Sequence, residues 1–248
     1  MGTLTGRSAV VTGGAKGIGA GIARSLAAAG ARVVVNYVSD AEAAGRVVAG
    51  IEHAGGRAIA VPADIRRPDD VERLIGTAES TFGVPDVLVN NAGVYGFGPL
   101  EAMTPEEFHR QIDTNLLGPF LTMQAFAGRA RPGASVVNIA TAGISTTPPY
   151  TSLYTATKAA LAAATSVLAK ELAPRGIRVN AIAASPSDTH GTRAMGFVGS
   201  PAEAEAVAGI PLGRLGVPED VGPVVAFLAS DDARWITGDV IFASGGQH

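Results

Sequence analysis

The chain has 248 residues, 47% of them hydrophobic and 17% charged, which is enough for one large α/β domain with a sizeable core. Nineteen basic and 22 acidic residues give a formal net charge of −3 without a run of like charges, which argues against nucleic-acid and membrane partners. The absence of cysteine excludes disulfides, thiolate metal sites and a cysteine nucleophile, and the four histidines lack metal-ligand spacing, so we expect no metal. No leader with a cleavage-site pattern and no apolar run of about 18 residues is visible, so we expect a soluble, cytoplasmic protein.

Short runs rich in Val and Ile alternate with longer Ala-rich segments of helical period. The expected strands are residues 8–11, 32–36, 58–61, 87–90, 135–140, 177–183 and 239–243. One expected helix follows the first strand and ends at residue 29, and three others cover about 40–54, 153–172 and 218–230. Two more begin near residues 68 and 105, and the second of these continues to about residue 127. Most strands are apolar throughout, which is typical of a parallel sheet covered by helices on both faces. We therefore predict one doubly wound Rossmann-type domain over residues 1–248, with about seven strands. The Gly-, Pro- and Ala-rich segment 185–215 shows no clear element and is expected to be a substrate lid loop.

The first expected strand runs directly into a glycine-rich segment and then a helix. Such a loop lets the backbone approach a dinucleotide pyrophosphate at the helix N-terminus. The glycine spacing differs from the usual Rossmann pattern, but the strand–loop–helix context supports the interpretation. The cofactor-binding candidates here are Gly13, Lys16, Gly17, Ile18 and Gly19.

The choice between dinucleotides is usually made at the end of the second strand. That position holds Asn36 and Tyr37, and the first acidic residue after them is Asp40. A carboxylate there would bind the ribose 2′-hydroxyl and repel a 2′-phosphate. Its absence, together with the cation of Lys16, favours NADP(H) over NAD(H), although a solvated surface lysine is the alternative interpretation of Lys16.

Tyr154 and Lys158 are four residues apart on an expected helix and therefore project from one face. A neighbouring ammonium would stabilise the phenolate and lower the pKa of the tyrosine, so that it could exchange a proton with a carbonyl or alcohol oxygen. This pattern alone is weak. Its position downstream of the glycine loop strengthens it.

Several ordered motifs together resemble the short-chain dehydrogenase/reductase family, over nearly the full length. The matching segments are the glycine loop, residues 63–65, 90–93 and 113–115, the Tyr154/Lys158 pair, and residues 213–216, 218–220 and 235–238. The branch of about 250 residues that includes β-ketoacyl-carrier-protein reductases and glucose dehydrogenases is the most similar.

The resemblance implies roles for further residues. Asn115 would hold a water that links Lys158 to solvent, and Lys158 would also bind the nicotinamide ribose. The remaining cofactor contacts implied are Asp64, Ile65, Asn91, Ala92, Gly93, Ser187 and Thr189. Asn91 could instead cap a strand end, and Asn115 could satisfy a helix kink.

Two positions depart from the family pattern. Thr141 stands where the family has the serine that polarises the substrate carbonyl; it keeps the donor hydroxyl but adds a methyl group. Ser145 is the less well spaced alternative. Ala184 and Ser185 replace a Pro-Gly pair near the nicotinamide.

The sequence thus predicts an NADP(H)-dependent carbonyl reductase or alcohol dehydrogenase acting on a small molecule. The alternative is a dinucleotide-binding sensor or scaffold in which these two changes have abolished catalysis. Candidate substrate-pocket residues are Tyr95, Phe97, Tyr150, His190, Met195 and Phe197. By resemblance, a homotetramer assembled through the helices near 105–127 and 153–172 is expected.

Overall fold

The computed structural model describes residues 3–248 and contains one parallel sheet of seven strands in the order β3-β2-β1-β4-β5-β6-β7. Between β1 and β4 the strand order reverses direction, as it does in dinucleotide-binding folds. The strands are β1 (Ser8–Val11), β2 (Arg32–Tyr37), β3 (Arg57–Pro62), β4 (Val87–Asn90), β5 (Ser135–Thr141), β6 (Arg178–Ala184) and β7 (Val240–Ala243). The predicted doubly wound Rossmann-type fold is confirmed.

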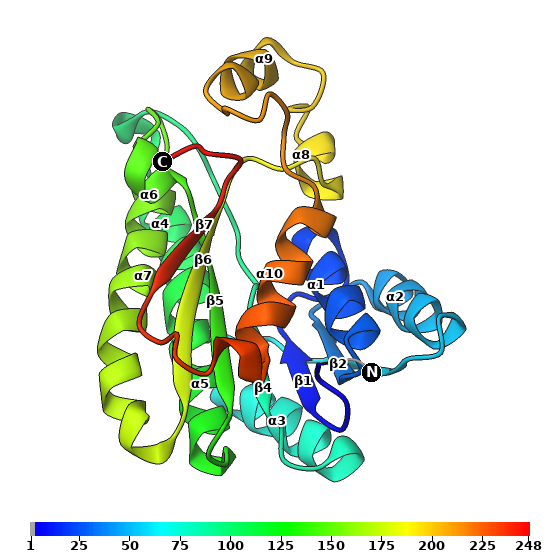
Figure 1. Ribbon diagram of the computed structural model, residues 1–248. Helices are drawn as coiled ribbons and strands as arrows, with labels where there is room; N and C mark the ends of the chain where they lie inside the picture. The colour runs from blue at the N-terminus through cyan, green and yellow to red at the C-terminus, as the bar shows by residue number, and fades with distance from the viewer. Residues whose placement is uncertain (1–2) are drawn as a thin grey trace.

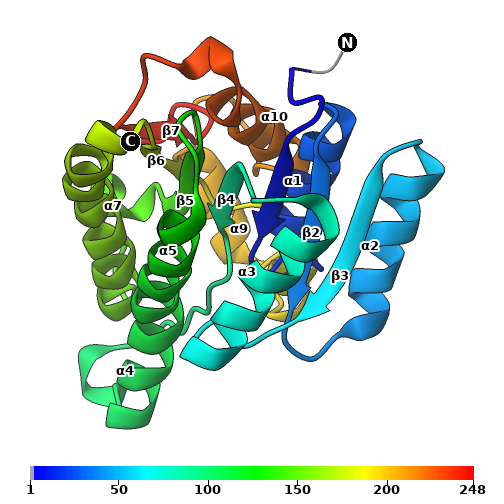
Figure 2. The ribbon, with the colours of Figure 1, turned by 90° about the horizontal axis from the view of Figure 1, so that it is seen from below.

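Helices cover both faces of the sheet, as Figure 2 shows, with α1 and α10 on one side and α3, α5 and α7 on the other. The long helices are α1 (Gly17–Ala28), α2 (Ala41–His53), α3 (Pro68–Phe82), α4 (Pro105–Ile112), α5 (Gly118–Arg129), α7 (Ser152–Leu172) and α10 (Pro218–Ala229). Two further short helices are α6 (Gly143–Thr146) and the 3-10 turn η1 (Leu100–Ala102).

The strands alternate their side chains between two hydrophobic cores. On β1, Ala9 and Val11 pack beneath α1 and α10, whereas Val10 packs on the opposite side beneath α3 and α5. Because both faces are buried, β1 and β4 are apolar at nearly every position, which explains why they read as continuous runs rather than as alternating ones.

The helix expected from residue 105 to about 127 is interrupted. One turn of π-helix, η2 (Asp113–Leu117), separates α4 from α5, and π-turns often occur at functional sites. The spacing of apolar residues does not reveal one extra residue in a turn. For this reason the sequence predicts one continuous helix where the structure has two.

The segment expected to be a loop over residues 185–215 contains two short helices, α8 (His190–Ala194) and α9 (Pro201–Ala208). Each begins at a hydroxyl cap, Thr189 for α8 and Ser200 for α9. Figure 1 shows both helices at the upper end of the molecule, beyond the carboxyl ends of the strands. No helix within residues 3–248 is long and apolar enough to cross a membrane.

Candidate active site

The glycine loop between β1 and α1 packs tightly against the segment that follows β4. A Cβ on Gly19 would lie 2.3 Å from the Gly13 carbonyl oxygen and 2.4 Å from Asn91 Nδ2, so only glycine fits there. Gly13 has a φ of +60°. Lys16, the N-cap of α1, provides no side-chain hydrogen bond to the first turn of the helix. The loop therefore presents uncapped N–H groups without side chains in front of them, which fits the diphosphate of a dinucleotide.

Side-chain amides and a hydroxyl hold this loop from behind. Asn91 Nδ2 donates to the carbonyls of Thr12 and Gly13, at 3.0 Å each. Thr12 Oγ1 accepts from the backbone N–H groups of Asn91 (3.0 Å) and Ala92 (3.1 Å). Thr12 was not singled out from the sequence, although its place as the first residue of the loop was visible there.

Asn36 is directed into the protein rather than toward solvent. Its Oδ1 accepts from the Gly13 N–H (3.2 Å) and its Nδ2 donates to the carbonyls of Val61 (3.3 Å) and Ala63 (2.9 Å). The side chain is fully buried and its amide has partners at both ends. Asn36 thus braces the glycine loop, and half-buried Tyr37, which follows it, lies nearer the surface.

Lys16 pairs with Asp40, the N-cap residue of α2. The neighbouring ammonium and the Ala43 N–H lower the pKa of the Asp40 carboxyl, which is therefore ionised at neutral pH. From the sequence, the end of β2 was expected to lack a carboxylate, with Asp40 as the first acidic residue after it. The turn between β2 and α2 brings it back to the glycine loop.

A cavity of about 390 Å³ lies between the start of α1, α2 and α8. Its ionisable lining comprises the cations Lys16, Arg24, Arg46 and Arg193 and the carboxylates Asp40 and Asp188, with His190 beside them. In a protein of net charge −3, this excess of cations favours a phosphate-bearing ligand.

At the third strand, Asp64 and Ile65 take different roles. Asp64 forms a two-oxygen ion pair with Arg66, which lowers the pKa of the carboxyl. Ile65 is buried against Gly118, where a Cβ would lie 2.5 Å from Ile65 Cδ1. Ile65 thus packs the segment after β3 against the start of α5.

Tyr154 and Lys158 lie one turn apart in α7, and Lys158 is buried. Its Nζ donates to the Ile139 carbonyl at 2.8 Å, and burial lowers the pKa of the ammonium to about 8. Burial raises the pKa of Tyr154 to about 12, while a hydrogen bond with Thr141 opposes that rise. The expected lowering of this pKa by the Lys158 ammonium is therefore wrong for this structure: burial dominates, and Lys158 Nζ is bound to the Ile139 carbonyl instead. The phenol is protonated at neutral pH and can act as a proton donor.

Asn115, from the π-turn η2, lies beside this pair. A Cβ on Gly93 would lie 3.3 Å from Asn115 Oδ1 and 3.4 Å from Lys158 Nζ, so the three residues converge. The Asn115 amide bonds both backbone groups of Val94 at 2.8 Å, and Nδ2 also donates to Thr157 Oγ1 at 3.1 Å. Thr157, adjacent to Lys158 in sequence, is a second supporting residue that the sequence reasoning missed.

Thr141 ends β5 and is the hydroxyl that accompanies Tyr154. Its Oγ1 accepts from the Gly143 N–H at 3.2 Å, and its hydroxyl lowers the pKa of Tyr154 against the effect of burial. Ser145, the alternative, is exposed in α6. The structure therefore places the threonine, not the serine, next to the phenol.

Ala184 and Ser185, which stand where the family pattern has a Pro-Gly pair, lie at the end of β6, and both are buried. Ser185 Oγ is directed toward Gly216, where a Cβ would lie 3.2 Å from it. Ser187 Oγ donates to the Ser185 carbonyl at 2.9 Å. Thr189 contacts the glycine loop: a Cβ on Gly17 would lie 3.4 Å from Thr189 Cβ. The segment 185–215, which is expected to be a lid, thus begins close to the first turn of α1.

The chain is similar to known proteins over nearly its full length. A family profile described as "Enoyl-(Acyl carrier protein) reductase" matches residues 13–248. An uncharacterised oxidoreductase of Methylorubrum extorquens is 50% identical over 246 residues, covering 99% of both chains. The 3beta-hydroxysteroid dehydrogenase 1 of Eggerthella lenta is 41% identical, covering 98% of this chain and 94% of its own. A short-chain dehydrogenase from Burkholderia cenocepacia, solved in complex with NADP, superposes with a TM-score of 0.92 at 36% identity, covering 99% of each chain. The chain belongs to the short-chain dehydrogenase/reductase family and is an oxidoreductase of that family.

Proposed function

We propose that the protein reduces a ketone or aldehyde to the alcohol with NADPH, and catalyses the reverse oxidation with NADP⁺. The observation that carries the proposal is the position of buried Lys158, one turn after Tyr154 on α7, whose Nζ binds the Ile139 carbonyl of β5 and lies beside Gly93 and Asn115. In the reduction, one carbonyl, one NADPH and one proton give one alcohol and one NADP⁺.

Bound NADPH would supply the hydride. The chain supplies the proton and the orientation: Thr141 Oγ1 donates a hydrogen bond to the carbonyl oxygen, and Tyr154 Oη donates the proton to it. The Lys158 ammonium stabilises the phenolate that remains. Asn115, held by Val94 and Thr157, lies beside Lys158 at the place from which a water could return the proton.

NADP(H) is proposed over NAD(H) because of charge. The cavity beside the glycine loop has four cationic side chains against two carboxylates, and the Burkholderia cenocepacia relative binds NADP. Ion pairs reduce this preference, because Lys16 is paired with Asp40, Arg46 with Glu42 and Arg193 with Asp188.

A screen of ketones, aldehydes and alcohols with both cofactors tests the proposal directly. We expect oxidation of NADPH in the presence of a ketone, with a lower kcat/KM for NADH. NADPH binding without turnover on any carbonyl would reject the proposal in favour of a dinucleotide sensor.

We also propose that the protein is a homotetramer that uses α4, α5 and α7 as interfaces. Large apolar side chains are exposed on these helices and on the π-turn η2 between α4 and α5: Phe108, Leu117, Phe120 and Val167. Light scattering coupled to size exclusion should give four times the chain mass of 24.9 kDa; a monomeric mass would reject it.

A further inference from the structure

Three aromatic rings meet at the catalytic tyrosine. The rings of Tyr95 and Phe97 are stacked, with centroids 5.7 Å apart and planes 12° apart. Both stand nearly perpendicular to the Tyr154 ring, at 6.2 Å and 88° for Tyr95 and 5.7 Å and 80° for Phe97. We call the Tyr95–Phe97 pair the aromatic wall. It offers flat ring surface directly beside the group that donates the proton.

The backbone of the aromatic wall is held by α4. Arg110 Nη2 donates to the Tyr95 carbonyl at 3.1 Å, and Gln111 Nε2 donates to the Gly96 carbonyl at 3.2 Å. Glu107 binds both donors, and these two side chains lower the pKa of its carboxyl to about 2. The wall is therefore fixed in place before a ligand arrives, which reduces the entropy lost on binding.

The lid helix α8 touches the same wall. A Cβ on Gly191 would lie 2.4 Å from Tyr95 Oη, so α8 approaches the ring with a glycine. Burial raises the pKa of Tyr95, which keeps its phenol uncharged. Tyr95 thus lies between the catalytic residue and the lid.

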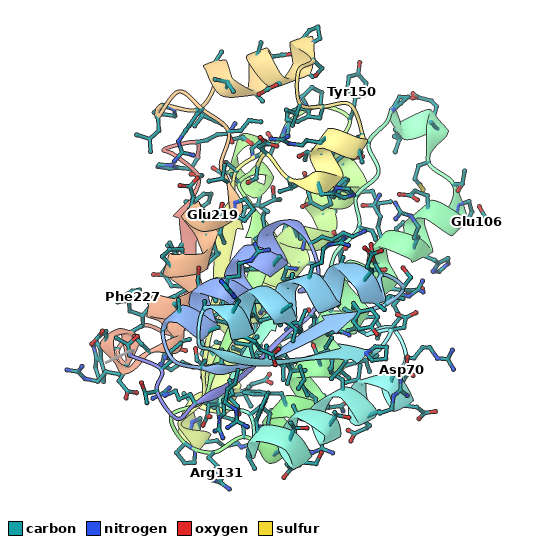
Figure 3. All side chains as sticks on the ribbon, turned by 90° about the vertical axis from the view of Figure 1, so that its right-hand side faces the viewer. Asp70, Glu106, Arg131, Tyr150, Glu219 and Phe227 are labelled. Atoms are coloured by element: carbon teal, nitrogen blue, oxygen red, sulfur yellow. The ribbon has the colours of Figure 1, made fainter. Side chains whose placement is uncertain are left out.

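The outer part of the site is apolar and solvent-exposed. Phe97 is 53% exposed, Tyr150 64% and Met195 51%. Tyr150 has a φ of +65°, unusual for a residue with a side chain, and its carbonyl accepts from the Gly98 N–H at 2.9 Å. Figure 3 shows Tyr150 at the end of the molecule where α8 and α9 lie. None of these side chains is charged, so an anionic substrate finds no partner among them.

We propose that the aromatic wall selects flat, uncharged ketones with fused rings, which stack on Tyr95 and Phe97 while their carbonyl reaches Tyr154. This inference rests on the proposed function. The ketone carbon gains a hydride from NADPH and its oxygen gains the Tyr154 proton, giving a secondary alcohol and NADP⁺.

Two ketones that differ by one ring test the selection. In 2-tetralone a benzene ring is fused to the cyclohexanone skeleton without conjugation to the carbonyl, so intrinsic reactivity is similar. We expect kcat/KM for 2-tetralone to exceed that for cyclohexanone by about tenfold or more, mainly through KM. Phe97→Leu should raise KM for 2-tetralone by about 3- to 10-fold, the range of one aromatic contact, and raise KM for cyclohexanone by less, so that the ratio of the two kcat/KM values falls.

Phe227→Leu is the matched control, since Phe227 is an exposed phenylalanine on α10 that Figure 3 shows away from Tyr150. It should change neither KM. Equal use of the two ketones, or a Phe97→Leu variant with an unaltered ratio, overturns the selection while leaving the reductase proposal standing.

A binding measurement separates the two proposals. Calorimetry with 2-tetralone and cyclohexanone on the NADP⁺-loaded protein should show tighter, Phe97-dependent binding of 2-tetralone. If 2-tetralone binds more tightly in this way but no ketone is turned over, the proposed function is rejected while the proposed selection by the aromatic wall is supported. Equal binding of the two ketones rejects the wall whatever the turnover.

Discussion

The two ends of the active site are built differently. At the cofactor end, the glycine loop is fixed by hydrogen bonds from Thr12, Asn36 and Asn91, each of which bonds backbone groups of the loop or of the strand beside it. At the substrate end, the aromatic wall, Tyr150 and the lid expose apolar side chains to solvent.

The difference separates two kinds of specificity. Backbone geometry determines whether the glycine loop can bind a diphosphate at all, so a substitution in the loop is tolerated only where a Cβ finds room. Side-chain shape and charge determine what the substrate end binds, so substitutions there should alter preference more than folding. The following variants test this contrast.

Tyr154→Phe should have the largest effect. It removes the proton donor but retains the ring that packs against the aromatic wall, so ketone reduction should fall by about 10³-fold. Initial rates of NADPH oxidation measure the loss. NADPH affinity, followed by fluorescence, should remain within about twofold; retained turnover would exclude Tyr154 as the proton donor.

Gly19→Ala should damage the cofactor end as a whole. The new methyl group would overlap the Gly13 carbonyl, and overpacking of this kind costs about 1–3 kcal/mol. We expect a lower Tm and NADPH affinity reduced by about tenfold or more. Gly50→Ala is the control, because α2 leaves open space there, and it should stabilise the protein by about 0.5–1 kcal/mol.

Lys158→Met should alter the pH dependence of stability. Burial lowers the pKa of Lys158 from 10.5 to about 8. Between these values the unfolded chain holds a proton that the folded protein has lost, so wild-type stability rises with pH over that window. Below pH 8, where the folded protein carries the buried charge, Lys158→Met should therefore be more stable, by on the order of 3 kcal/mol.

Urea denaturation from pH 7 to 10.5 checks this, and the gap should close as pH rises. Lys170→Met, at the exposed end of the same helix, is the control and should show no such window. Wild-type stability that is flat from pH 8 to 10 would contradict the expected burial of the ammonium.

Asp40→Asn should have the smallest effect. Asparagine retains the N-cap of α2 and removes the charge that pairs with Lys16. The ratio of kcat/KM for NADPH to that for NADH should rise by about 2- to 5-fold, as for an exposed ion pair. Asp69→Asn, with the same charge change in the first turn of α3, should leave the ratio unchanged.

The strands, and the placement of Tyr154 and Lys158 on one helix, could be predicted because their signals are local. Continuous apolar runs located β1 and β4 at their observed bounds, and the spacing of Tyr154 and Lys158 placed both on one helix. Asn36 was expected to contact the cofactor, yet its amide is directed into the protein and binds backbone groups. The alternation of side chains along a strand does not show which buried hydrogen-bond partners a side chain will have. The contact between Asp40 and Lys16 depends on the path of the turn between β2 and α2, which the sequence does not give. The stacking of Tyr95 on Phe97 depends on hydrogen bonds from α4, a helix that is distant from both residues in the sequence.

The π-turn at Asp113–Leu117 has a consequence for the counting of residues. A π-turn holds one residue more than the α-helical path around it, so α4 and α5 run out of phase with each other. The rotation of α4 about its axis directs Arg110 toward the loop that carries Tyr95. The rotation of α5 about its axis allows it to pack on α3 and β4. A chain shortened by one residue here would have to give up one of these two registers, which makes the length of this segment, and not only its composition, a condition for assembling the site.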